Sequence, residues 1–166
     1  MLIGLLSDTH GFLDEKILGH FTSCDEIWHA GDIGDESVAK QLSSFKPFRA
    51  VYGNIDGTNI RTMFPEYLYF ICEKVNVLIT HIGGTPAYYQ TPAQKLIDQI
   101  HPDIFICGHS HICKVQQDKK NNMLYMNPGA AGKSGFHKMR TILRFSINGN
   151  KIEDMDVIEL GLRSAL

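Results

Sequence analysis

The chain has 166 residues, 43% of them hydrophobic, which suits a single domain with a buried core over residues 1–166. The formal net charge of −2 gives no general electrostatic case for binding nucleic acid or an anionic membrane. The N-terminus does not resemble a signal peptide, no apolar run approaches the roughly 20 residues that span a bilayer, and the four cysteines include no C-x-x-C pair, so a cytoplasmic protein without disulfides is expected.

Strand and helix patterns alternate through the first two thirds of the chain. The predicted strands are residues 2–6, 26–29, 48–52, 67–72, 75–80 and 104–107, and the predicted helices are residues 13–21, 35–45 and 91–100. Asp35 is expected to cap the second helix. Thr91 at the N-cap, Pro92 at N1 and Gln94 at N3 predict a capping box on the third.

The pattern changes after residue 107, where strands follow one another without a clear helix. They are predicted at residues 112–117, 123–126, 140–146 and 151–158, and Asn148–Gly149 is a strong hairpin signal between the last two. A half rich in βαβ units followed by a half rich in strands indicates a sandwich of sheets covered by helices, within one α/β domain.

Polar residues of a few types follow the ends of five predicted strands. Aspartate, histidine and asparagine supply the oxygen and imidazole ligands that suit divalent metals such as Mn²⁺, Fe²⁺ and Zn²⁺. The carboxyl ends of strands in such sheets meet at one rim, where ligands bind. Seven side chains are candidate ligands: Asp8, His10, Asp32, Asn54, His81, His109 and His111.

Four of these candidates form two pairs whose members are two residues apart. In extended backbone, residues i and i+2 point to the same side, so Asp8 with His10, and His109 with His111, are each expected to aim two ligands at one place. Seven ligands exceed the need of one metal, but they suit two metals about 3.5–4 Å apart that share a carboxylate, the usual clamp for displacement at phosphorus.

The order of these blocks carries a specific resemblance. D-x-H, then G-D, then G-N, then an isolated histidine, then G-H-x-H resembles the calcineurin-like metallophosphoesterase superfamily. The short chain without a cap is similar to its small YfcE-type phosphodiesterases, and Asn127-Pro128-Gly129 resembles a downstream N-P-G-S element. The fold that this resemblance implies is a four-layer α/β/β/α sandwich of two mixed β-sheets flanked by helices.

The resemblance also implies which residues bind each metal ion. It gives a first metal held by Asp8, His10 and His111, a second held by Asn54, His81 and His109, and a bridging Asp32. It further implies a hydroxide between the metals as the nucleophile. Manganese is the first choice of metal by this resemblance, and the ligand set would also accept Fe²⁺, Co²⁺, Ni²⁺ or Zn²⁺.

Two positions depart from the family pattern. Many members continue the G-N block with a histidine that helps to protonate the leaving group, whereas this chain has Ile55, as the small phosphodiesterase branch commonly does. Ala130 replaces the serine of N-P-G-S. The first departure favours substrates with good leaving groups, so we expect activity on activated aryl phosphodiesters and little on alkyl monoesters.

Other polar residues have more ordinary explanations. Asp56 is expected to brace its loop, and three further histidines are read as structural: His20, His29 and His101. For the basic loop that contains His137, Lys138 and Arg140, we favour the interpretation that it is exposed to solvent. The alternative is that one of these residues contacts the substrate phosphate or the leaving group.

The sequence therefore predicts a two-metal phosphoesterase, specifically a phosphodiesterase of small substrates, which forms a dimer or tetramer as family members often do. One alternative is a phosphomonoesterase or a nuclease of the same fold, although the modest charge argues against a nucleic-acid track. Another is a metal-binding scaffold for protein partners, related to a eukaryotic retromer subunit. Loss of ligands would mark a scaffold, and here all seven are present.

Overall fold

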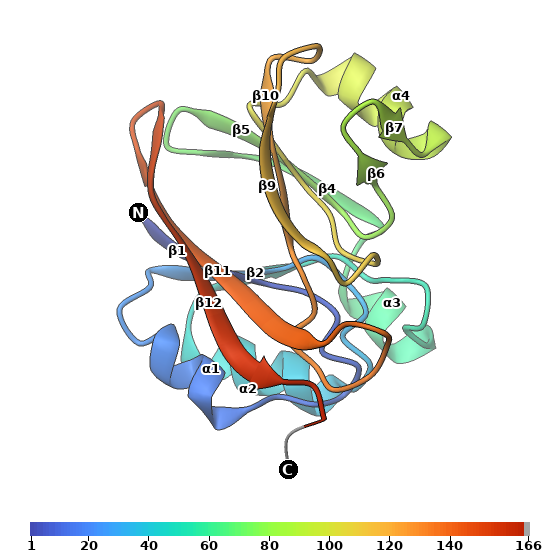
Figure 1. Ribbon diagram of the computed structural model, residues 1–166, viewed down its shortest axis with the longest axis vertical. Coiled ribbons are helices and arrows are strands. Elements are labelled where there is room, and N and C mark those ends of the chain that lie inside the picture. Colours follow the sequence, from blue (N-terminus) through green and yellow to red (C-terminus); the bar gives the residue numbers. More distant parts are fainter. Residues whose placement is uncertain (165–166) are drawn as a thin grey trace.

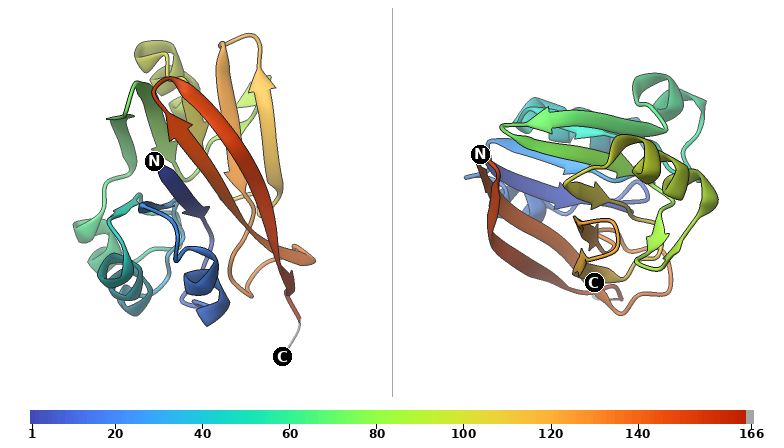
Figure 2. Two further views of the ribbon diagram at one scale, coloured as in Figure 1. Left: turned by 90° about the vertical axis from the view of Figure 1, so that its left-hand side faces the viewer. Right: turned by 90° about the horizontal axis from the view of Figure 1, so that it is seen from above.

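The computed structural model describes residues 1–164 and contains two five-stranded mixed sheets packed face to face (Figures 1 and 2). The first sheet has the strand order β12-β11-β1-β2-β3, and its strands are β1 (Leu2–Leu6), β2 (Glu26–His29), β3 (Phe48–Ala50), β11 (Met139–Asn148) and β12 (Lys151–Leu162). The second has the order β4-β5-β8-β10-β9, and its strands are β4 (Tyr67–Cys72), β5 (Val75–Thr80), β8 (Ile104–Ile106), β9 (Cys113–Asp118) and β10 (Met123–Pro128).

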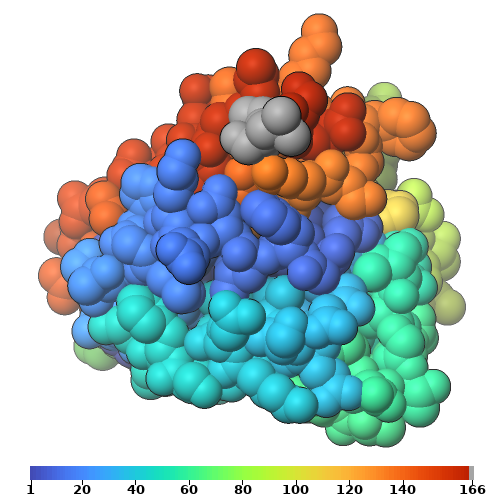
Figure 3. All heavy atoms as spheres, turned by 90° about the horizontal axis from the view of Figure 1, so that it is seen from below, coloured from blue at the N-terminus to red at the C-terminus, as the bar shows by residue number. Residues whose placement is uncertain are grey.

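Helices cover the outer faces of both sheets. The described helices are α1 (Glu15–His20), α2 (Glu36–Phe45), α3 (Thr58–Met63) and α4 (Thr91–Ile100). Helices α1 and α2 lie against the first sheet and α4 lies against the second (Figure 1). The space-filling view from below shows that the first third of the chain, coloured blue to cyan, forms much of the face on the side of α1 and α2 (Figure 3). The α/β/β/α sandwich expected from the sequence is confirmed.

Three apolar clusters hold these four layers together. The cluster between the sheets contains fully buried residues of both, among them Leu5, Trp28 and Ile106. A second cluster joins the first sheet to α1 and α2, and a third, which includes Phe105, joins the second sheet to α4. Burial of such side chains stabilises the fold by roughly 1.5–3 kcal/mol each. The two sheets are therefore fixed relative to each other, and so are the loops at their ends.

The sequence located the strands better than the helix ends. Helix α1 begins two residues later than predicted because Asp14 caps it, accepting a hydrogen bond from the Lys16 backbone. The capping box predicted at Thr91 is wrong: Gln90 occupies the N-cap without a side-chain bond, and the Gln94 side chain donates to Asp98 instead. The sequence reading also missed α3 and the small ribbon of β6 (Gly84–Thr85) and β7 (Tyr88–Tyr89).

Strand direction brings the loops of both sheets to one rim. Strands β1, β2 and β3 run parallel to one another, and β5 runs parallel to β8. Backbone hydrogen bonds join the loops that follow them, such as Asp8 to Gly31 at 3.0 Å and Gly108 to His81 at 3.0 Å. No helix among residues 1–164 is long and apolar enough to cross a bilayer.

Candidate metal centre

The seven candidate ligands all follow strands whose carboxyl ends lie at this rim. Asp8 and His10 follow β1, Asp32 follows β2, Asn54 follows β3, His81 follows β5, and His109 and His111 follow β8. Six of them form two groups whose ligand atoms lie within 4.8 Å of one another: Asp8 with His10 and His111, and Asp32 with His81 and His109. The resemblance implies the same division for five of these residues, whereas it makes the sixth, Asp32, a bridge between the two metals.

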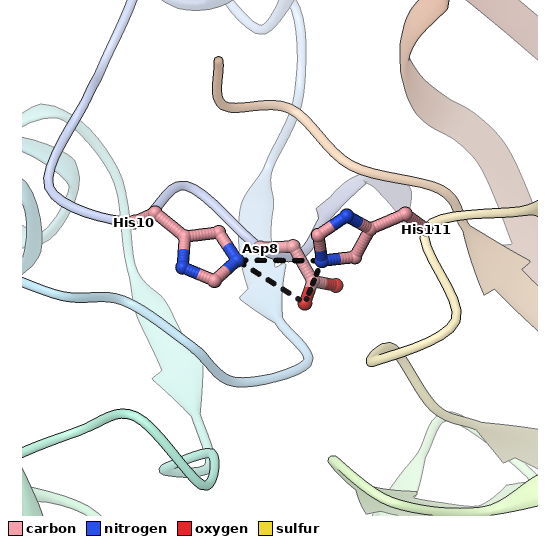
Figure 4. Close-up of side chains that lie close together, drawn as sticks. All are labelled: Asp8, His10 and His111. Carbon is pink, nitrogen blue, oxygen red and sulfur yellow. Dashed lines mark hydrogen bonds and ion pairs between the residues drawn. The ribbon is translucent and has the colours of Figure 1, made fainter. Parts of the chain in front are cut away.

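The first group is centred on one carboxylate oxygen. Oδ1 of the fully buried Asp8 lies 3.1 Å from Nε2 of His111 and 3.8 Å from Nε2 of His10. The two Nε2 atoms are 3.3 Å apart. The other oxygen of Asp8 accepts a hydrogen bond from the His109 backbone, which fixes the orientation of the carboxylate. Figure 4 shows the three side chains converging, Asp8 and His10 from the loop after β1 and His111 from the loop after β8.

The second group is centred on Asp32. Oδ2 of this buried carboxylate lies 3.2 Å from Nε2 of His81 and 3.8 Å from Nε2 of His10. Asp32 therefore faces both groups, which is the position that a bridging ligand requires. Its second oxygen accepts a hydrogen bond from the Ile55 backbone at 3.0 Å.

Asn54 lines the cavities beside the two ligand groups. It lines a cavity of about 420 Å³ together with residues of both groups, and it also lines a neighbouring cavity of about 280 Å³ that includes His81. The guanidinium of Arg61 donates hydrogen bonds to the carbonyls of Gly53, Asn54 and Asp56, so it holds the loop that carries Asn54.

The geometric reason given for the paired ligands is wrong. Asp8, His10, His109 and His111 have φ angles of 54°, 49°, 67° and 59°, so none of them is in extended backbone. Left-handed conformations cost non-glycine residues about 1–3 kcal/mol each and gather at functional sites. The expectation that each pair aims at one place holds for Asp8 and His10, which share a group, but not for His109 and His111, which point into different groups.

Two buried polar atoms in the site are suited to binding a cation. Among residues 1–164, Oδ1 of Asp8 and Nε2 of His81 are buried without a hydrogen-bond partner. The other ring nitrogen of His81 is 2.8 Å from the carbonyl oxygen of Ala30, to which it must donate, so a neutral His81 turns a lone pair toward the carboxylates. Such an arrangement is repulsive unless a proton or a metal ion lies between the partners.

The pKa shifts reflect the same demand for positive charge. Burial alone would lower the pKa of His81, but the carboxylates of Asp32 and Asp8 outweigh this effect and raise it. Burial likewise opposes ionisation of Asp32, yet His81 beside it and the Ile55 amide lower the pKa of that carboxyl. A divalent ion supplies this positive charge without a proton, so the residues fit a metal pair.

Asp56 braces the ligand loops, as expected from the sequence. Its buried carboxylate accepts hydrogen bonds from the backbones of Ile33 at 3.1 Å, Gly34 at 2.7 Å and Gly53 at 2.7 Å. These bonds tie the loop after Asp32 to the loop that carries Asn54. A Cβ atom on Gly53 would lie 2.0 Å from Oδ1 of Asp32, so only glycine permits this close approach.

His29 supports the site from within the core. Its Nδ1 accepts from the Gly31 backbone, so Nε2 donates to the Thr9 hydroxyl at 3.0 Å, and that hydroxyl donates to Ile33. Burial lowers the pKa of His29 to about 4. The ring stays neutral and links the loops after β1 and β2, which agrees with the structural role expected for it.

The Asn127-Pro128-Gly129 element supports the turn of the paired histidines. Asn127 donates to the carbonyl of Gly108 at 2.9 Å and to the hydroxyl of Ser110 at 3.1 Å. Its own oxygen accepts from Gly129 at 2.9 Å. In the sequence this element is recognisable only by its family resemblance, and the available signal for a bracing role is an asparagine that ends an apolar run just before Pro-Gly.

The basic loop near residue 137 divides into separate roles. Arg140 is buried and bonds to Asp14 and to the carbonyl of Ala131, so it is a structural residue and not a substrate contact. His137 packs against His111, with ring centroids 5.1 Å apart. The interpretation of this loop as merely solvated is therefore wrong for both residues, whereas Lys138 is exposed.

Comparisons with known proteins agree with this geometry. The sequence model of the calcineurin-like phosphoesterase superfamily domain matches residues 1–150. A probable metallophosphoesterase of Methanocaldococcus jannaschii is 30% identical over 138 residues, which are 78% of this chain and 68% of that protein. One of Methanothermobacter thermautotrophicus is 27% identical over 167 residues, covering 97% and 94%. Wild-type Vps29 of Entamoeba histolytica, crystallised with Zn²⁺, has the same fold, with a TM-score of 0.76 at 14% identity over 99% of this chain and 100% of that one.

Proposed function

Because the chain belongs to the calcineurin-like phosphoesterase superfamily, a family of metal-dependent phosphoesterases, we propose that it is a phosphodiesterase that works with two divalent metal ions. The observation that carries the two-metal part is the convergence of six ligand side chains into two groups, with Asp32 of the second group also facing His10 of the first. Manganese is the proposed ion, and Fe²⁺, Co²⁺, Ni²⁺ and Zn²⁺ suit the same ligand set.

Each ligand residue has a definite task in this proposal. Asp8, His10 and His111 hold one ion, His81, His109 and Asn54 hold the other, and Asp32 is shared. When bound, such an ion pair polarises the phosphoryl oxygens and lowers the pKa of a water, which becomes the nucleophile. The chain itself fixes the ligand atoms before any ion arrives, because backbone hydrogen bonds orient Asp8 and Asp32.

The shape of the site favours a diester over a monoester. Two cavities, of about 420 Å³ and about 280 Å³, are both lined by Asn54 and share no other lining residue. A diester has an organic group on each side of phosphorus, and the two cavities offer one place for each. Three exposed apolar residues line the larger cavity and suit an aromatic or aliphatic group: Ile55, Ile112 and Phe136.

The nature of residue 55 limits the leaving group. Ile55 lines the larger cavity but carries no proton to donate. His137, which lines the same cavity, has Nδ1 3.2 Å from His111 and Nε2 3.1 Å from the Gly132 carbonyl, so neither nitrogen is free to protonate a departing oxygen. The proposed enzyme therefore depends on leaving groups that depart without a proton, such as phenolates.

A substrate comparison tests the proposal. The protein loaded with Mn²⁺ is assayed against bis(p-nitrophenyl) phosphate, p-nitrophenyl phosphate and an alkyl monoester, with and without chelator. We expect turnover of the aryl diester to exceed that of both monoesters and to vanish on chelation. Faster turnover of the monoesters would show that the protein is a monoesterase instead of a diesterase. Diester turnover that survives both chelation and Asp32→Ala would refute the metal mechanism.

A scaffold function accounts for the site less well. A protein that only docks partners needs no buried carboxylates facing four imidazoles, and the strain at the ligand residues would serve no purpose. Failure of the metal-loaded protein to hydrolyse any phosphoester would reopen that alternative.

A further inference from the structure

His137 lies directly behind one of the ligand histidines. Its Nδ1 is 3.2 Å from Nδ1 of His111, and its Nε2 is 3.1 Å from the carbonyl oxygen of Gly132. A carbonyl oxygen only accepts hydrogen bonds, so Nε2 of His137 carries the hydrogen. In the neutral ring Nδ1 is then an acceptor, and the hydrogen between the two rings belongs to Nδ1 of His111.

This chain of bonds settles the tautomer of His111. With hydrogen on Nδ1, Nε2 of His111 keeps its lone pair, and this atom faces Oδ1 of Asp8 at 3.1 Å and Nε2 of His10 at 3.3 Å. Figure 4 shows Nε2 of His111 turned toward the other two side chains and the second ring nitrogen turned away from them. The opposite tautomer would place a hydrogen where the metal is expected.

We propose that His137 is a positioning residue that holds His111 in the tautomer and orientation needed to bind the first metal ion. This inference rests on the metal binding proposed above and adds a residue outside the seven ligands. It gives the histidine of the basic loop a task other than contact with the substrate phosphate or leaving group.

The backbone of the same loop also packs against His111. A Cβ atom on Gly135 would lie 2.2 Å from Nδ1 and 2.3 Å from Cε1 of the His111 ring, and Gly135 has a φ of 116°. Glycine alone adopts this conformation readily and leaves room for the ring. The loop therefore fits His111 at two points. The side chain of His137 contacts Nδ1 of His111, and Gly135, which has no side chain, leaves room for the His111 ring.

The second ligand group is held in a different way. Nδ1 of His81 contacts the carbonyl of Ala30, a backbone group that no side-chain substitution removes. Replacement of His137 should for this reason affect the group of Asp8, His10 and His111 and spare the group around Asp32. An effect restricted to one ion distinguishes positioning from general damage to the fold.

Calorimetric titration of the metal-free protein with Mn²⁺ tests the inference. The wild type is expected to bind two ions. In His137→Ala, one of them is expected to bind about 10–100-fold more weakly, the usual effect of losing a partner that orients a ligand, while the other keeps its affinity. His137→Gln offers both an acceptor and a donor and should recover part of the loss. Ser134→Ala, on the exposed part of the same loop, is the matched control and should bind as the wild type does.

Nitrogen NMR of the histidine rings gives a second readout that needs no variant to fold. In the metal-free wild type, Nδ1 of His111 should carry a hydrogen, whether or not Nε2 also shares a proton with Oδ1 of Asp8, and in His137→Ala the hydrogen on Nδ1 should be partly lost. A His111 without hydrogen on Nδ1 in the wild type overturns the inference, and so do unchanged affinities or equal weakening of both ions in His137→Ala. A wild type that binds no pair of ions overturns the proposed function instead, which separates the two failures.

Discussion

Replacement of Asp56 by alanine should destabilise the protein far more than removal of a typical surface carboxylate. The substitution deletes the acceptor for three backbone N–H groups, those of Ile33, Gly34 and Gly53, of which two bonds are buried. Each donor left unsatisfied costs about 1–3 kcal/mol. Water reaches the most exposed of the three, so the two buried donors give an expected total of about 2–6 kcal/mol. That is a large share of the roughly 5–15 kcal/mol that keeps a domain folded.

Urea unfolding in the presence of chelator measures this cost without a contribution from metal. For a slope of about 2 kcal/mol per molar urea, the midpoint should fall by about 1–3 M. The matched control is Asp35→Ala, which removes an exposed N-cap with one bond to Ser37 and should cost about 1 kcal/mol. Asp56→Asn keeps the shape and one acceptor oxygen, so its loss should be intermediate and the variant should stay folded.

The result that would refute this reasoning is a small cost for Asp56→Ala. If its free energy of unfolding lies within about 1 kcal/mol of the Asp35→Ala value, water satisfies the three donors and Asp56 is not the brace of the ligand loops. A folded Asp56→Asn with lowered Mn²⁺ affinity would show in addition that the brace positions the ligands.

Three further predictions concern the ligand loops. Asp32→Ala should lower turnover of an aryl diester by about 10²–10³-fold, since several kcal/mol of transition-state stabilisation are lost, and calorimetry should show fewer than two bound Mn²⁺ ions; unchanged stoichiometry would exclude Asp32 as the bridge. Gly53→Ala should weaken Mn²⁺ binding at least about tenfold, because its Cβ would lie 2.0 Å from the Asp32 carboxylate, whereas Gly57→Ala has no atom within 4 Å and should bind normally; equal affinities would contradict the argument. Burial lowers the pKa of His29 to about 4 in the folded state against 6.5 when unfolded, so the unfolded state binds more protons between these values and stability falls as the pH is lowered through this window. The wild type should therefore lose about 2 kcal/mol more than His29→Asn between pH 7.5 and pH 5 in urea unfolding, and parallel losses would show that His29 is not buried neutral.

The sequence alone was enough to predict the strands and the rim. Apolar runs followed by Asp, His or Asn identified β1, β2, β5 and β8 closely, because a buried strand must be apolar and the polar residues that follow mark its end. The loops after these strands and after β3 supplied all seven candidate ligands. Local sequence patterns were a weaker guide to the starts of the helices. Asp14 is the N-cap of α1, and Gln90 is the N-cap of α4 in place of the expected Thr91.

Only the tertiary structure decided how the ligands divide. Spacing in the sequence did not decide it, because all four paired residues have left-handed backbone, yet Asp8 and His10 share a group while His109 and His111 belong to different groups. Asp56, Asn127 and His137 act through groups 23, 19 and 26 residues away, respectively, at loops that meet at the rim. Residue type and order determine which side chains are able to bind a metal, whereas the packing of two sheets determines which of them meet and which hydrogen bonds hold them in place.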